Sequence, residues 1–251
     1  MIPKIIHQIW LQGYNSIPQS LKEYHEKCKT INSNFKHMFW NEAKIKKLLL
    51  GNFGQQYVEL FNFFEIFAQK ADFARYAILY IYGGIYLDMD TICKKNLEPF
   101  LNLNFFTTIA GDSFYEFYER YHNAVIGTIP KHPLFLIMFK NIFERIQYAN
   151  NVTYSTGTRL FYDSVQEYVK THANDITIID PKYLHPCGIH SGPDCADTCD
   201  ECYIVHTNNS SWSSGAKLIK YMCKNKYLIL IIIAIIIAIL YFYFKNKRGN
   251  D

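Results

Sequence analysis

The chain has 251 residues, of which 49% are hydrophobic, 17% aromatic and only 19% charged. This composition is that of a globular chain with a sizeable core, and it excludes a disordered or collagen-like protein. The net charge of +4 is unevenly placed: residues 217–251 hold seven basic residues and one acidic residue, which leaves 19 basic and 21 acidic residues in 1–216. A mildly acidic globular part argues against a nucleic-acid partner.

Strand-like and helix-like segments alternate through residues 1–216. Strands are expected where short runs are rich in β-branched or aromatic residues, and helices where apolar residues recur every three or four positions. In chain order we expect a strand at 4–10, a helix at 21–29, a strand at 35–40, helices at 42–50 (ended by Gly51) and 65–82, strands at 85–87, 105–109 and 124–128, helices at 134–148 and 158–172, and strands at 175–180 and 203–207. This alternation predicts an α/β fold with parallel strand pairing.

An apolar segment follows this globular part. Residues 227–244 carry no charge, and as a helix they would span about 27 Å, close to the thickness of a membrane's hydrocarbon core. We therefore predict one C-terminal transmembrane helix at 227–244, a basic juxtamembrane linker at 217–226 and a short basic tail at 245–251. A buried core helix is the alternative.

The side of the membrane on which residues 1–216 lie is harder to predict. The first residues contain no apolar run typical of a signal peptide, which favours a single-pass protein with a C-terminal anchor and a cytosolic domain. Glycosylation sequons at Asn151, Asn208 and Asn209 would instead suit a lumenal domain.

Four of the seven cysteines cluster within residues 187–202. The spacing of Cys199 and Cys202 would suit a zinc site, whereas disulfides would be expected in a lumenal domain. A third alternative is a loop with free thiols, and the spacing does not decide among the three.

Asp72 and Arg75 are the first candidate site residues. Within the predicted helix at 65–82 they are three positions apart and so share a face. They could form a surface ion pair of little consequence. Because their neighbours are apolar or aromatic, we expect this face to be partly buried, where sugar hydroxyls could supply the additional partners that a desolvated pair needs.

Asp88 and Asp90 follow directly after an apolar strand. If the strand continued through them, both carboxylates would point to the same side. Two carboxylates aimed together suit Mg²⁺ or Mn²⁺ lying between them and a phosphate. A short Asp-x-Asp sequence is by itself a weak signal, since such residues often lie in solvated turns.

The whole pattern resembles the DXD-containing glycosyltransferases of family 32, which include mannosyltransferases of glycans and sphingolipids. The matching motifs are residues 2–10 (IPKIIHQIW), Asp72-x-x-Arg75-Tyr76, residues 82–90 (YGGIYLDMD), Asn123 to Ile126 with His132-Pro133, Thr156-Gly157, His206 and Ser211-Trp212. One departure is Thr158, where relatives often have proline. The resemblance implies a GT-A-like nucleotide-sugar-binding domain over residues 1–216, with a Rossmann-like mixed sheet flanked by helices.

The resemblance also implies roles for individual residues. Asp90 would bind the metal directly, Asp88 would bind metal, ribose or both, and His206 or Ser210 would complete the metal shell. Donor-side roles would fall to Ile9 and Trp10 for the base, Asp72 and Arg75 with nearby Tyr86 for the sugar, and Trp212 for the diphosphate. Trp10 could instead be a core aromatic, and His206 a structural hydrogen-bonder.

The implied function is a membrane-anchored, Mn²⁺- or Mg²⁺-dependent retaining hexosyltransferase. Its donor would be GDP-mannose, which is favoured, or a UDP-sugar, and its acceptor a glycan, glycoprotein or glycolipid. A non-catalytic sugar-binding relative or a membrane adaptor is the alternative, but neither Arg75, Asp88 nor Asp90 has been lost.

Overall fold

The computed structural model of the chain describes residues 1–109, 121–188 and 195–207, together with 225, 231 and 235–237. Six strands form the main sheet, in the order β2-β1-β3-β6-β5-β7. Their bounds are Ile5–Ile9 (β1), Lys36–Trp40 (β2), Gly84–Leu87 (β3), Phe105–Ile109 (β5), Tyr121–Thr128 (β6) and Ile176–Ile179 (β7). A small second sheet pairs β4 (Thr91–Cys93) with β8 (Ile204–His206) in antiparallel fashion.

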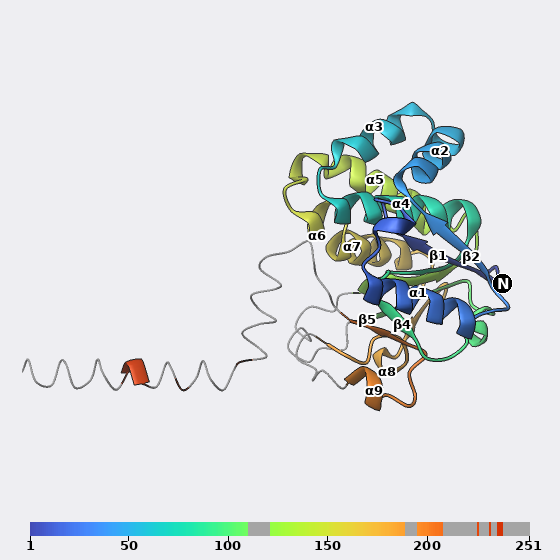
Figure 1. Cartoon of the computed structure of the whole chain (residues 1–251). Coiled ribbons are helices and arrows are strands. Elements are labelled where there is room, and N and C mark those ends of the chain that lie inside the picture. The colour runs from blue at the N-terminus through green and yellow to red at the C-terminus, as the bar shows by residue number, and fades with distance from the viewer. Residues whose placement is uncertain (110–120, 189–194, 208–224, 226–230, 232–234, 238–251) are drawn as a thin grey trace, which may run out of the picture.

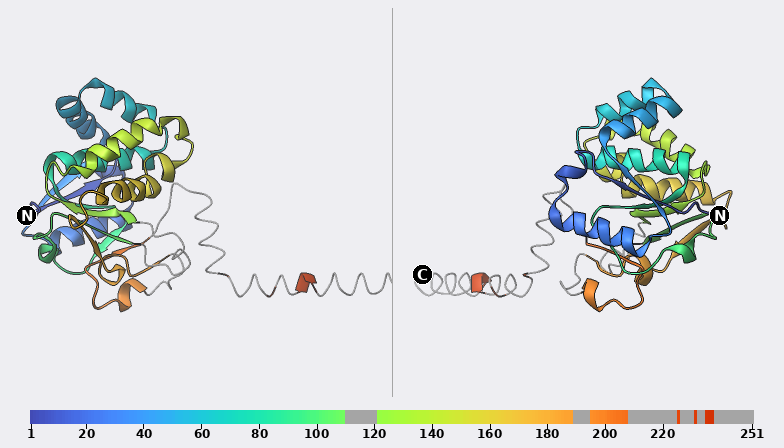
Figure 2. Two further views of the ribbon diagram at one scale, coloured as in Figure 1. Left: turned by 180° about the vertical axis from the view of Figure 1, so that it is seen from behind. Right: turned by 45° about the vertical axis from the view of Figure 1, so that its right-hand side comes forward.

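The described helices cover both faces of the main sheet (Figures 1 and 2). The longer ones are α1 (Gln19–Ile31), α2 (Glu42–Phe53), α3 (Gln55–Phe63), α4 (Phe67–Tyr82), α5 (Leu134–Glu144) and α7 (Thr158–Val169). Short α-helical segments are α6 (Val152–Ser155), α8 (Pro181–Leu184) and α9 (Cys195–Thr198). Short 3₁₀ turns lie at Tyr14–Ser16, Glu98–Phe100 and Ile146–Tyr148. Helices α2 to α5 and α7 cover one face of the sheet, whereas α1, α8 and the small sheet lie on the other (Figure 1).

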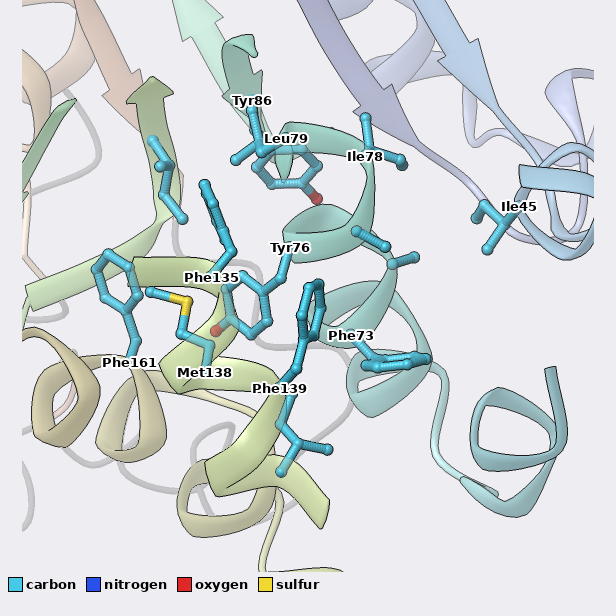
Figure 3. Packing of buried hydrophobic residues seen from close by; sticks show 14 of the residues in the cluster. Ile45, Phe73, Tyr76, Ile78, Leu79, Tyr86, Phe135, Met138, Phe139 and Phe161 are labelled. Atoms are coloured by element: carbon cyan, nitrogen blue, oxygen red, sulfur yellow. The ribbon is translucent and has the colours of Figure 1, made fainter. Parts of the chain in front are cut away.

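The alternation of side chains along the strands divides the core in two. Tyr86 of β3 packs on the face covered by α4 and α5, while its neighbours Ile85 and Leu87 pack on the face covered by α1 and the small sheet. This is the period-two pattern of a strand buried on both sides. In the first cluster, Phe73 and Tyr76 of α4 meet side chains of α5 and α7 (Figure 3). The middle of α4, from Phe73 to Leu79, is buried, so this helix holds its polar residues at fixed positions.

Most predicted elements are confirmed, and the sheet is mixed, as the resemblance implies, and not wholly parallel, as the alternation of elements alone indicates. Strand β6 runs antiparallel to both β3 and β5. Ile109 at the end of β5 stands opposite Tyr121 at the start of β6, so the chain returns alongside itself and needs no crossover helix. Strands β1, β2 and β3 are parallel to one another, as are β5 and β7.

The predicted C-terminal end of the helix at 42–50 is wrong. Helix α2 does not end at Gly51 but continues to Phe53 and is closed by Gly54, whose φ of 90° only glycine adopts readily. The expected helices 134–148 and 158–172 end earlier, at Glu144 and Val169. Helix α3 and strand β4 were not predicted.

The turn between α4 and β3 depends on two glycines. Gly83 and Gly84 have φ values of 61° and 91°, a region that L-residues with a Cβ rarely enter. A Cβ on Gly84 would lie 2.7 Å from the Ile5 carbonyl oxygen of the neighbouring strand. The pair therefore lets α4 end and β3 begin in the middle of the sheet, which aims Asp88 toward α4.

Within the described residues, none of the helices is long and apolar enough to cross a membrane. The expected span at 227–244 lies outside them except for Ile231 and residues 235–237.

Candidate active site

A line of polar side chains runs along one face of α4 toward the C-terminal end of β3. Asp72 and Arg75 form an ion pair with 3.1 Å between Oδ1 and Nη2, and their exposed fractions are 6% and 5%. One turn earlier, the buried Gln69 donates to the Ala149 carbonyl and to Ser155 Oγ. The pair is therefore buried, as expected, and the alternative of a surface ion pair is excluded.

Arg75 joins α4 to two strands. Its Nη2 lies 3.2 Å from Asp88 Oδ1 and its Nη1 donates to the Asn123 carbonyl oxygen at 2.5 Å. The guanidinium lies 4.5 Å from the ring centroid of Tyr86, whose hydroxyl donates to Asp88 Oδ1 at 2.7 Å. Burial disfavours a charged arginine, but Asp88 and the other groups around it outweigh this effect and raise the pKa of Arg75. Arg75 is thus a fixed positive charge at the start of the DXD turn.

Asp72 is held by three donors, which come from α4, from β6 and from the residue that follows α6. Besides Arg75, Asn123 Nδ2 donates to its Oδ1 at 2.9 Å and Thr156 Oγ1 donates to its Oδ2 at 3.1 Å. Burial, assisted by nearby Asp88, raises the pKa of Asp72 to about 6, because Arg75 and the two donors only partly compensate for the loss of water. A carboxylate positioned in this way could also accept a hydrogen bond from a sugar hydroxyl.

Asp88 and Asp90 lie in a tight turn and not on a continuing strand, which corrects the sequence interpretation. Strand β3 ends at Leu87, and the Thr91 N–H donates to the Asp88 carbonyl at 3.2 Å, so the chain turns into β4. The turn arises because β4 pairs with β8 of the small sheet and leaves the main sheet. The two carboxylates nevertheless come together, since both face the same histidine.

That histidine is His206, at the end of β8 and opposite Thr91 in the ladder. Its Nε2 lies 3.0 Å from Asp90 Oδ1 and 3.6 Å from Asp88 Oδ2. Burial disfavours its charged form, but the Asp90 and Asp88 carboxylates overcome this effect and raise the pKa of His206 to about 10. One ligand atom from each of these three residues falls within 4.8 Å of the others, which makes them a candidate metal group.

The other predicted site residues differ in their placement. The Ile9 side chain is buried in the core cluster beneath α4, so a contact of Ile9 with the base would have to come from its main chain. Trp10 is half-buried beside Met89 of the DXD turn, and its Nε1 donates to Ser16 Oγ at 3.0 Å. Ser210 and Trp212 lie outside the described residues.

Sequence reasoning missed several residues of this region. Asn123 and Thr156 were noted only as motif positions, although both hold Asp72. The signal available for Asn123 is its place beside a predicted strand that pairs with the strand before Asp88. His122 and His185, whose ring centroids are 4.2 Å apart, were not predicted as site residues; His185 was relevant only as a neighbour of the cysteine cluster for which zinc was one alternative. Burial, with His185 and His206 nearby, lowers the pKa of His122 well below its ordinary value.

The described cysteines are paired as disulfides. Cys187 bonds Cys195 and Cys199 bonds Cys202, so the disulfide alternative holds for the cluster. A further disulfide, between Cys28 and Cys93, joins α1 to β4 across 65 positions and was not predicted. It ties the strand that follows the DXD turn to helix α1, which lies on the same face of the main sheet.

Comparison with known proteins agrees with this geometry. A family model described as "Glycosyltransferase sugar-binding region containing DXD motif" matches residues 18–110. An uncharacterised glycosyltransferase of Acanthamoeba polyphaga mimivirus is 55% identical over 232 residues, which are 92% of this chain and 92% of that protein. A mannosyl phosphorylinositol ceramide synthase of Saccharomyces cerevisiae is 29% identical over 86% of this chain, but the match spans only 54% of that protein.

The fold has a solved counterpart as well. The PaToxG glycosyltransferase superposes with a TM-score of 0.50 at 19% identity, covering 67% of this chain and 70% of that one. That likeness concerns the fold, a mixed sheet flanked by helices of the GT-A type. The motif match and the close viral relative lead to one conclusion: the chain belongs to the DXD-motif glycosyltransferases of family 32.

Proposed function

We propose that the chain is a membrane-anchored, metal-dependent retaining glycosyltransferase that moves a hexose, with mannose favoured, from a nucleotide sugar to a glycan or lipid acceptor. The observation that carries this proposal is the meeting of Asp88, Asp90 and His206 next to the buried Arg75. Carboxylates and a histidine meet there at the end of a strand, where ligands bind in α/β folds.

The donor atoms of this group suit the expected cation. Two carboxylates and one imidazole form a ligand set compatible with Mn²⁺, and the oxygen atoms also suit Mg²⁺. When bound, such an ion neutralises charge on the nucleoside diphosphate as it leaves. In this proposal Asp90 and His206 hold the ion, Asp88 holds the ion or the ribose, and Ser210 and Trp212 act from the segment that follows β8.

The donor sugar would lie beside Asp72, Arg75 and Tyr86. Arg75 keeps the Asp88 carboxylate in place, and Asn123 and Thr156 fix both oxygens of Asp72, so the side chains that face the sugar are already oriented. Such preorganisation lowers the reorganisation that the reaction requires. Asp72 and Asp88 are both engaged by Arg75, so we do not assign either carboxylate as a nucleophile that attacks the sugar. We therefore favour substitution on the same face of the sugar, in which a leaving-phosphate oxygen takes the acceptor proton.

The choice of mannose and of a lipid acceptor rests on similarity. The yeast relative is named as a mannosyl phosphorylinositol ceramide synthase, and the chain spans about half the length of that protein. A membrane anchor at 227–244 would keep the site close to such an acceptor.

The experiment that tests this function uses the full-length chain purified in detergent with Mn²⁺ and a panel of nucleotide sugars. Release of nucleoside diphosphate is followed with and without a chelator. We expect chelator-sensitive release from one donor, GDP-mannose first. Release that persists in chelator would contradict the metal dependence, and release only from another donor would contradict mannose.

The anchor and its orientation need a separate test. The disulfides favour an oxidising compartment and hence a lumenal domain, whereas the sequence analysis favours a cytosolic one. We expect the full chain to sediment with membranes after carbonate washing, and a chain ending at residue 216 to be released. Glycosylation of the sequon at Asn151, lost in Asn151→Gln, would indicate a lumenal domain, whereas protease access to the same domain in intact vesicles would indicate a cytosolic one.

A further inference from the structure

Next to the carboxylate group, three imidazoles meet from three separate elements. His122 comes from β6, His185 follows α8, and His206 ends β8. One ring nitrogen from each lies within 4.8 Å of the others. His185 and His206 are buried and His122 is half-buried, so the cluster lies largely within the fold.

The spacing of the rings is that of a metal-bound imidazole set. With metal–nitrogen bonds of 2.0–2.1 Å in tetrahedral geometry, the ring centroids of two coordinated histidines stand about 5 Å apart. Here the three centroid distances are 4.2, 4.9 and 5.5 Å. The Ala124 N–H donates to His122 Nδ1 at 3.3 Å, so coordination through that nitrogen would replace one long hydrogen bond.

The chemistry of the cluster differs from that of the carboxylate group. Imidazole nitrogens favour Zn²⁺ and its neighbours among the later transition metals, whereas Mg²⁺ and Mn²⁺ prefer oxygen. The carboxylates of Asp88 and Asp90 lie 3.6 and 3.0 Å from His206 Nε2, and their negative charge would favour a cation nearby. Three imidazole ligands with two carboxylates next to one of them therefore suit a divalent cation.

We propose that His122, His185 and His206 form a second cation site, specific for Zn²⁺ or a similar late transition metal and distinct from the Asp88–Asp90–His206 group. His206 belongs to both groups, so a cation held by the three imidazoles withdraws His206 from the carboxylates. The second site therefore regulates the first: Zn²⁺ weakens the binding of Mn²⁺. The experiments below measure metal binding and not glycosyl transfer. The second site can therefore be rejected while glycosyl transfer is observed, or be found while no transfer is observed.

The experiment is a titration of the full-length chain with Co²⁺, which reports coordination through its visible d–d absorption. We expect wild-type protein to give the intense absorption of four- or five-coordinate Co²⁺, which one equivalent of Zn²⁺ removes. His122→Ala and His185→Ala should lose it, while Asp88→Asn/Asp90→Asn and the exposed-histidine control His172→Ala should keep it. Thiolate coordination by the cysteine cluster would instead add a charge-transfer band.

Folding is checked for each variant by circular dichroism and thermal unfolding. If an alanine variant does not fold, His122→Gln and His185→Gln, which keep a planar polar side chain, take its place. The proposal is overturned if wild type gives no such absorption, or if folded His122 and His185 variants retain it. An absorption lost only in the double aspartate variant would assign the cation to the carboxylate group instead.

The regulatory part is tested by the electron paramagnetic resonance signal of free Mn²⁺. One equivalent of Zn²⁺ should raise the Kd of wild-type protein for Mn²⁺ by about 10-fold or more, the range in which changes around a metal's ligands act. In His122→Ala the same addition should have no such effect. Equal weakening in both proteins would mean that Zn²⁺ competes directly for the carboxylates, and the second site would be rejected.

Discussion

At the scale of single residues, Arg75 is the group on which the site is built. It contacts Asp72 and Asp88, donates to the Asn123 carbonyl and lies over the Tyr86 ring. A planar guanidinium can make these contacts in several directions at once, which the single ammonium of lysine cannot do. The site thus depends on the geometry of this side chain as much as on its charge.

Replacing Arg75 with Met should destabilise the fold by about 3–5 kcal/mol, because the buried Asp72 carboxylate and the partly buried Asp88 carboxylate lose their partner. Arg75→Lys should retain part of that stability but lose most of the activity. Urea unfolding and nucleoside diphosphate release, measured on the same preparations, give the two values. A Lys variant with full activity would show that only the charge matters.

Replacing Asp90 with Ala should lower kcat by about 10³-fold or more, in line with the loss of a main electrostatic element of a catalytic site. Its carboxylate lies only 12% exposed and 3.0 Å from His206, yet it sits in a turn and not in the core, so the fold should persist. Turnover and thermal unfolding are compared with those of Asp197→Ala, at a position in α9. An active Asp90→Ala enzyme would rule out the metal role.

At the scale of elements, His7 connects three segments beneath the site. Trp40 Nε1 of β2 donates to His7 Nδ1 at 3.1 Å, so the proton of neutral His7 lies on Nε2, 2.9 Å from the Gly83 carbonyl. This arrangement holds β1 and β2 against the glycine turn that begins β3. Burial lowers the pKa of His7 to about 4, more than the Gly83 carbonyl can offset.

His7 should therefore make stability depend on pH. Its folded-state pKa is below the unfolded value of 6.5, so the unfolded chain binds the proton first as pH falls. The stabilisation is present above about pH 6.5 and is lost toward pH 4, by about 3 kcal/mol over the full range. In His7→Gln, urea unfolding should show this dependence reduced by that amount, while His172→Gln keeps it. Equal pH dependence in His7→Gln and wild type would contradict the assignment.

At the scale of the whole molecule, helix α1 and the small sheet, which lie on the same face of the main sheet, are joined by the Cys28–Cys93 disulfide. Both cysteines are fully buried, and the bond links α1 to the strand directly after the DXD turn. A bond across 65 positions restricts the unfolded chain strongly. It therefore contributes to stability and also keeps β4, and with it Asp90, in place.

Replacing both Cys28 and Cys93 with Ala should lower the free energy of unfolding by about 2–4 kcal/mol under oxidising conditions. The matched control, Cys187→Ala/Cys195→Ala, opens a loop across only 8 positions and should cost less. Urea unfolding is measured with and without reductant, and the difference between wild type and the Cys28/Cys93 variant should vanish in reductant. A difference that persists there would come from packing and not from the bond.

The sequence by itself determined most of the elements and the main site residues. Periodicity and glycines located β1, α4 and β3, and the resemblance at Asp72, Arg75, Asp88 and Asp90 indicated a nucleotide-sugar site, because these signals lie within short stretches of chain. The antiparallel course of β6, the pairing of β4 with β8, the DXD turn and the Cys28–Cys93 bond were decided only in three dimensions. Each depends on partners far apart in the chain, and the meeting of His122 and His185 with His206 is of the same kind.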